Sequence, residues 1–284
     1  MTTFIQLVVS GIGAGAAYSL VGIGMVLVFR TTGIINFAQG AFAVIGGLVT
    51  AQLAGQMPVA LAALIAVAIS IAVGVAMGFV SVGRRGITTP LASLIITIGL
   101  AFLAEAVELI VFGDNPLTFP AIGQRAWHVG GILVEPQYAL TFGLAVAFAV
   151  ALWLLVGRTI VGHALVACSD SRHAAELVGL NPRVLGMASF GLAALLGAVG
   201  GIVLTPIVAL QFDSDVSIAV NAFVAAVFGG LVSISGAFVG GLVLGVAEAL
   251  VSDYISADYD LTIALVLMLV VMVARAVRTQ VAEA

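Results

Sequence analysis

The chain has 284 residues, of which 63% are hydrophobic and only 8% are charged, and its mean hydropathy is +1.30. A soluble domain usually carries about 25% charged residues, so this composition excludes a soluble protein and predicts an all-α polytopic membrane protein. The formal net charge is -4, and the single cysteine excludes a disulfide framework or a multi-cysteine metal site.

Apolar runs long enough to cross about 30 Å of hydrocarbon predict the membrane spans. In chain order they lie near 4–29, 35–55, 58–82, 90–112, 137–157, 183–208 and 259–276. A further apolar run, 218–252, is too long for one ordinary span, and glycines and serines interrupt its centre. We therefore expect about eight transmembrane helices in one transmembrane domain, 1–284, in which 218–252 is a broken helix or a helical hairpin.

The arginines indicate the orientation, because cytoplasmic loops are enriched in basic residues. With the N-terminus outside and 218–252 crossing once, six of the nine arginines lie inside. If 218–252 enters and returns as two short halves hinged at Ser233–Gly236, eight lie inside and only Arg125 remains outside. The hairpin is favoured, and it places the C-terminus and the loop 158–183 in the cytoplasm and the loop 113–136 outside.

The loop 158–183 is the longest polar interruption and holds three arginines, two histidines and the only cysteine. Ser169 or Asp170 can cap a short helix over 171–178, and Gly179 can end that helix in a left-handed conformation. Asn181, followed by Pro182, is a typical helix start. The pattern predicts a short helix on the inner face of the membrane, rigidly joined to two spans. The alternative is an ordinary solvated loop helix without a partner.

Two groups of polar and small residues are candidates for a translocation path. Asn36, Phe37 and Gln39 enter a span just before Gly40, where their amides could bind a zwitterion or simply bond neighbouring helices. Ser233, Ser235 and Gly236 form the break in 218–252. Broken helices line substrate paths in transporters but also occur as kinks buried between helices.

Three carboxylates fall inside the predicted membrane region. Glu105 and Glu108 lie three residues apart on one helical face, toward the outer end of the fourth span, and Glu248 stands alone near the outer end of the hairpin. Intramembrane acids are costly and are functional candidates by default, although a wet helix end is the simpler alternative here. The three histidines are dispersed, and we expect no metal site, no bound cofactor and no catalytic cluster.

Three ordered segments carry a resemblance to a known family. They read TGIINFAQG at 32–40, RTIVGHALVACSDSRHAAELVGLN at 158–181 and VFGGLVSISGAFVGG at 227–241. They are similar to motifs of the permeases of branched-chain amino acid ABC importers, more narrowly the LivH type. The resemblance implies a pore of two permease subunits, often LivH-like with LivM-like, two cytoplasmic ABC ATPases that use ATP and Mg, and an extracytoplasmic binding protein. It also implies a coupling helix for the ATPase that includes Asp170, Arg172, Ala174, Ala175, Glu176, Leu177 and Gly179.

The chain contains no lysine, so it cannot form a P-loop, and any ATPase must be a separate chain. We predict a multi-pass permease subunit in the bacterial inner membrane, surrounded by lipid and without a nucleic-acid partner, that imports amino acids, first among them branched-chain ones. One alternative is an ion-coupled secondary transporter of small polar solutes with Glu105 and Glu108 as its coupling site. Another is an ABC permease for urea, short amides or aromatic acids.

Overall fold

The computed structural model describes residues 2–82, 90–121, 123, 126–129, 132–170 and 172–283, and most of them are helical. The α-helices are α1 (Thr2–Thr32), α2 (Gln39–Ala54), α3 (Val59–Ser81), α4 (Pro90–Phe112), α5 (Pro136–Arg158), α6 (Ile160–Asp170), α7 (Arg172–Leu177), α8 (Pro182–Leu204), α9 (Ser214–Phe228), α10 (Ile234–Tyr254) and α11 (Asp260–Glu283). A short 3-10 helix, η1 (Ala257–Tyr259), precedes α11.

Six of the described helices are long and apolar enough to cross a membrane: α1, α3, α4, α5, α8 and α10. The apolar helices α2 and α9 are shorter, with 16 and 15 residues. The prediction of a polytopic helical membrane protein is therefore confirmed. The span expected from residue 35 begins only at Gln39, because Gly33 ends α1 with a φ of +71° and residues 34–38 are not helical.

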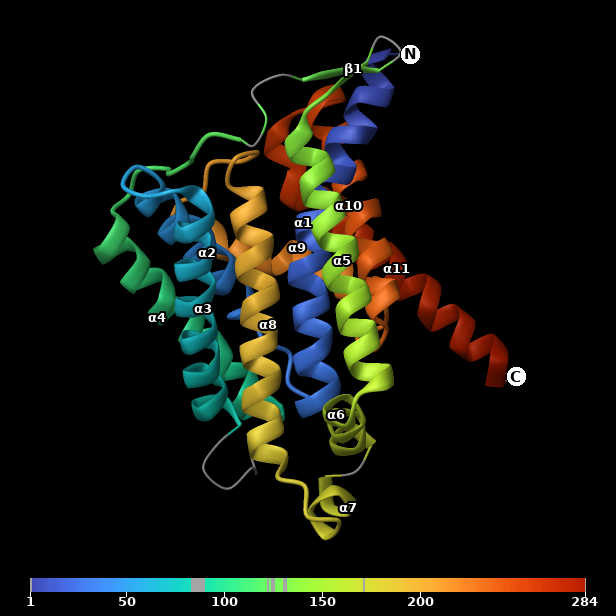
Figure 1. Cartoon of the computed structure of the whole chain (residues 1–284). Coiled ribbons are helices and arrows are strands. Elements are labelled where there is room, and N and C mark those ends of the chain that lie inside the picture. The colour runs from blue at the N-terminus through green and yellow to red at the C-terminus, as the bar shows by residue number, and fades with distance from the viewer. Residues whose placement is uncertain are drawn as a thin grey trace.

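The helices form one bundle around α1, which packs against α5, α8, α9 and α10 (Figure 1). The N-terminus and the segment that follows α4 lie at one end of this bundle, and α6 and α7 lie at the opposite end (Figure 1). The helix α4 lies at the edge of the bundle and packs against α2 and α3.

Small residues let α1 and α10 approach backbone to backbone. A Cβ atom added to Gly15 would lie 2.5 Å from the carbonyl oxygen of Gly241, and one added to Gly11 would lie 2.7 Å from that of Gly245. Between the same two helices, the hydroxyl of Ser19 donates a hydrogen bond to the carbonyl oxygen of Phe238, 2.8 Å away. Close packing through small residues is a common way for membrane helices to associate, and these four glycines define what we call the glycine seam.

The break in 218–252 lies at other residues than predicted, and the two helices that it separates differ in length. The helical break covers residues 229–233, and Ser235 and Gly236 already belong to the first turn of α10. Gly230 and Leu231 both have positive φ values, +66° and +63°, so the chain turns sharply directly after α9. Only α9 is short. The second half, α10, has 21 residues and is a full-length apolar helix rather than a short one.

The loop predicted at 113–136 contains structure that the sequence did not indicate. Its strands β1 (Trp127–Val129) and β2 (Ile132–Val134) pair antiparallel, and Leu117 forms an isolated bridge with Leu210. Arg125, like the pair Arg84 and Arg85 used for the orientation, lies outside the described residues.

Candidate functional site

The short helix predicted in the loop 158–183 is present as α7, and its C-terminal end is fixed by Gly179 as predicted. The predicted cap at its start is wrong, because Ser169 and Asp170 are the last residues of a preceding helix, α6. Gly179 has a φ of +83°, its N–H donates to the carbonyl of Glu176, and the N–H of Leu180 donates to that of Ala175. This pair of bonds is the Schellman motif, which satisfies carbonyl groups left free at a helix end. The chain therefore turns within three residues of Leu177 and continues toward α8.

The start of α8 completes this rigid connection. The side-chain oxygen of Asn181 accepts hydrogen bonds from the backbone N–H groups of Arg183 and Val184, at 3.1 and 3.3 Å, and Pro182 occupies the first helical position. The predicted cap is confirmed. With a Schellman turn on one side and a capped helix on the other, α7 has little freedom to move independently of α8.

The exposed surface of α7 is unusually apolar for a helix at the end of the bundle. Leu177 is 76% exposed and the neighbouring Val178 is 74% exposed, whereas Ala175 is only 2% exposed. Ala174 and Glu176 are exposed as well, and Asp170 and Arg172 are the last residue of α6 and the first of α7. Exposed apolar groups outside the spans are typical of a surface that another protein covers.

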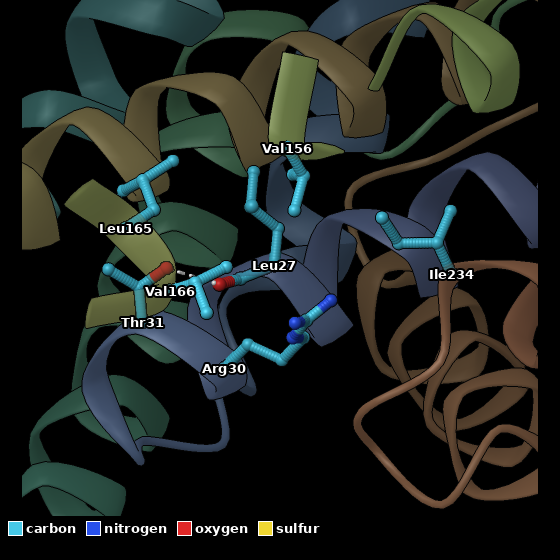
Figure 2. A pocket seen from close by; sticks show the side chains of 7 residues that line it. All are labelled: Leu27, Arg30, Thr31, Val156, Leu165, Val166 and Ile234. Atoms are coloured by element: carbon cyan, nitrogen blue, oxygen red, sulfur yellow. Dashed lines mark hydrogen bonds between the residues drawn. The ribbon is translucent and has the colours of Figure 1, made fainter. Parts of the chain in front are cut away.

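Sequence reasoning missed α6, which joins α5 to α7. The hydroxyl of Thr159 accepts a hydrogen bond from the N–H of Gly162 at 3.0 Å and so caps the start of α6. Figure 2 shows how α6 is anchored: Leu165 and Val166 face Leu27 and Thr31 of α1 around a small cavity that Val156 and Ile234 also line. The helix is therefore part of the bundle, and it packs against α1, α5 and α8 as well as α7.

The candidate path residues before α2 are buried and hydrogen-bonded. Asn36 and Gln39 are completely buried, and the Asn36 amide donates to the Gln39 side-chain oxygen at 3.3 Å. The Gln39 amide in turn donates to the carbonyl of Ala193 in α8 at 2.9 Å. Phe37 packs against Phe223 of α9, with 5.9 Å between ring centroids. These contacts tie the α1–α2 connection to two other helices.

The second candidate group, Ser233, Ser235 and Gly236, stabilises the α9–α10 turn. The Ser233 hydroxyl accepts a hydrogen bond from the N–H of Gly236 at 3.0 Å and caps α10, and it lies 3.1 Å from the Ser235 hydroxyl. Gly236 packs directly on Gly229. The two groups are connected through α9, since Gly40 of the first group packs on the backbone of Asp215 near the start of that helix.

Arg275 of α11 also contacts the chain at the start of the α9–α10 turn. Its guanidinium donates to the carbonyl of Phe228, the last residue of α9, at 2.6 Å.

We expect the Arg275→Gln variant to lose roughly 1 kcal/mol of stability, because the Phe228 carbonyl at the end of α9 would lose the charged group that donates a hydrogen bond to it. Thermal unfolding of the purified protein in detergent measures this, with Arg275→Lys, which keeps the charge, expected between the two. Identical unfolding temperatures for the wild type and Arg275→Gln would show that the contact contributes nothing.

The intramembrane acids are more buried than a wet helix end requires. Glu108 is 2% exposed, and neither of its carboxylate oxygens has a hydrogen-bond partner among the described residues. Glu105 is half-buried, and Asp215, which the sequence analysis did not single out, lies close enough to Glu108 to interact electrostatically. Glu108 therefore lies inside the bundle, whereas a hydrated helix end would be exposed.

Glu248 does not stand alone, as the sequence suggested. It is 8% exposed, and the side chains of Tyr18 of α1 and Asn221 of α9 lie close enough to interact with it. These three residues are far apart in the chain, so no local pattern could have joined them. The one available signal was Asn221, a lone amide in an apolar segment, which in a membrane helix usually finds a polar partner.

A bundle of long apolar helices with buried polar groups and a rigid helical projection at one end is the architecture of a membrane transport permease. The family described as "Branched-chain amino acid transport system / permease component" matches residues 7–273, and the chain belongs to this family. It is a multi-pass protein of the bacterial inner membrane.

Individual relatives agree with this assignment. The chain is 28% identical to the high-affinity branched-chain amino acid transport system permease protein LivH of Salmonella typhimurium, over 95% of this chain and 92% of that protein. It is 29% identical to the corresponding protein BraD of Pseudomonas aeruginosa, over 96% and 94%. It is also 26% identical to the galactofuranose transporter permease protein YtfT of Escherichia coli, over 83% and 67%.

Proposed function

We propose that this chain is one of two permease subunits of an ATP-driven importer of branched-chain amino acids. The printed names of the LivH and BraD relatives support the substrate, and the family description supports the role. Two separate ATPases bind ATP and Mg, and an extracytoplasmic binding protein delivers the ligand. The second permease subunit is a LivM-like chain, so that the pore is a heterodimer.

The observation that carries this proposal is the rigid, partly apolar projection formed by α7. Leu177 and Val178 present exposed apolar side chains, and the Schellman turn and the Asn181 cap join them to α8 without slack. A partner ATPase that binds this surface can transmit its motion directly to α8. Through α6 the same motion reaches α1 and α5. Alternating access then follows ATP binding and hydrolysis in the partner.

We propose that the N-terminus lies outside and the C-terminus inside, with about eight transmembrane segments if α9 and α10 are counted together as one hairpin. In this orientation α6 and α7 are cytoplasmic. Arg30 lines the small cavity beside Ile234, and Arg275 binds the carbonyl of Phe228, so both arginines lie beside the α9–α10 turn. Their gathering at one end supports the orientation, since basic residues favour the cytoplasmic side.

The residues that line the path are proposed to be those that connect moving helices. The Asn36–Gly40 segment joins α1, α2, α8 and α9, and Ser233–Gly236 joins α9 to α10. Interhelical hydrogen bonds between membrane helices are worth only about 1 kcal/mol each. The Asn36 and Gln39 amides can therefore exchange these bonds for a zwitterion at small cost.

Co-purification tests the proposal. The chain, co-expressed with its candidate partners and purified by a tag, should bring down two P-loop ATPases and one further permease. The assembled complex in liposomes, supplied with binding protein, should accumulate radiolabelled leucine only when ATP is present. Ion-driven uptake by the purified chain alone would contradict the proposal, and uptake of urea or an aromatic acid in place of leucine would contradict the substrate.

A further inference from the structure

A cavity of about 500 Å³ lies between α2, α3 and α4. Its walls are aliphatic side chains such as Ile45, Val73 and Leu100, and Glu108 is the one ionisable residue among the described residues that line it. Ligand pockets in proteins typically measure roughly 300–1,000 Å³ and combine apolar walls with a few polar groups that orient the ligand. The size and the lining of this cavity match that description.

The carboxylate of Glu108 is not compensated by the protein. It is nearly completely buried, and neither oxygen has a hydrogen-bond partner in the described part of the chain. The charged groups that reach it electrostatically are Asp215 and Glu105, which are both acidic. A buried acid in such surroundings either takes up a proton or gains a cationic partner, and a ligand with a protonated amine can supply the positive charge and the hydrogen-bond donors.

The walls indicate which kind of cation fits. Metal ions such as Na⁺, Mg²⁺ or Ca²⁺ need several oxygen ligands, and the other lining side chains are hydrocarbon, apart from the thioether of Met77. An ammonium group on an aliphatic body matches both the carboxylate and the walls. Val80 of α3 and Val107 of α4 line the cavity and are each 50% exposed, so the cavity opens to the surface along these two helices and a ligand can enter it.

We propose that this cavity binds a small aliphatic ammonium compound, with the amino group on the Glu108 carboxylate and the hydrocarbon part against α3 and α4. The inference goes beyond the proposed function, because the described lining offers a carboxylate to an amino group but offers no cationic partner to the carboxylate of an amino acid. Glu108 is then the residue that recognises the amino group of this ligand, and the cavity walls contact its hydrocarbon part.

Binding of two probes to the assembled transporter in nanodiscs, without ATP, tests this directly. One probe is 3-methylbutylamine, which has the amino group and the branched chain, and the other is 4-methylpentanoate, which has the chain and a carboxylate instead. Titration calorimetry should detect the amine and not the acid. The Glu108→Gln variant should bind the amine at least about tenfold more weakly, because it loses a charged hydrogen-bond acceptor. Glu105→Gln, which removes a neighbouring carboxylate that does not line the cavity, should weaken binding far less than Glu108→Gln does.

The Val73→Trp variant adds bulk to the cavity and should also weaken binding of the amine. If the wild type does not bind the amine, or if Glu108→Gln binds it as the wild type does, the proposal is overturned. Lipid that co-purifies with the wild type and is lost only from Val73→Trp would identify the occupant as an acyl chain and would equally overturn it. Leucine uptake and ATPase co-purification, measured on the same samples, show separately whether the proposed function holds.

Discussion

Replacing Gly179 with proline should leave the permease folded in the membrane and reduce ATP-driven leucine uptake by more than about tenfold. Proline holds φ near −65°, whereas Gly179 has a φ of +83° and donates its N–H to Glu176. Both the conformation and the bond are lost, and strain of this kind costs about 1–3 kcal/mol locally. Because the turn lies outside the membrane spans, the cost falls on the connection between α7 and α8. ATP hydrolysis by the assembled complex should continue without transport.

The matched control at this position is Gly179→Asn. Asparagine tolerates the left-handed conformation better than other non-glycine residues and keeps the N–H group, so uptake should stay close to that of the wild type. A second variant, Ala175→Arg, places a long charged side chain at a position that is 2% exposed and should uncouple uptake in the same way. If Gly179→Pro assembles with its ATPases and still transports at the wild-type rate, α7 is not the coupling element.

Replacing Gly245 with valine should prevent the protein from reaching its native fold. The added side chain would meet the backbone of Gly11 and Gly15 across the glycine seam, and backbone cannot move aside as a flexible side chain can. Overpacking in a close-packed interior costs about 1–3 kcal/mol or more even where side chains can yield. We expect little monodisperse protein on size-exclusion chromatography in detergent, and a lowered unfolding temperature for what remains.

Gly143→Val is the matched control for the seam. Gly143 lies in the membrane helix α5, and an added Cβ atom would have no neighbouring atom within 4 Å. The same change of residue type therefore tests propensity and hydrophobicity without the steric contact, and its yield should match that of the wild type. Equal yields for both valine variants would mean that α1 and α10 are not held as closely as described.

The features that the sequence predicted well are those decided by a few neighbouring residues. The end of α7 and the start of α8 follow from Gly179 and Asn181, which form hydrogen bonds only with residues a few positions away. The spans α3, α4 and α5 follow from uninterrupted apolar runs. The start of α6 was also local, because Thr159 caps it, but a helix so short and so close to α5 was interpreted as part of a loop.

The features that were missed depend on which helices become neighbours. Glu248 gains Tyr18 and Asn221 only when α1, α9 and α10 pack together. Glu108 is buried because α4 lies against α2 and α3, which its own position near a helix end did not suggest. The place of the break after α9 depends on the left-handed conformations of Gly230 and Leu231. A positive φ is uncommon for leucine, so the sequence did not predict a turn at this residue.

The glycine seam has a consequence for the order in which the protein is assembled. It joins a helix at the start of the described chain to one near its end, and the bond from Ser19 to Phe238 spans 219 residues. During synthesis α1 enters the membrane long before α10 exists, and contacts between such distant segments form late. Until then the small residues of α1 face lipid or other helices without their final partner. A helix that enters the bilayer early is therefore among the last to be fixed in place.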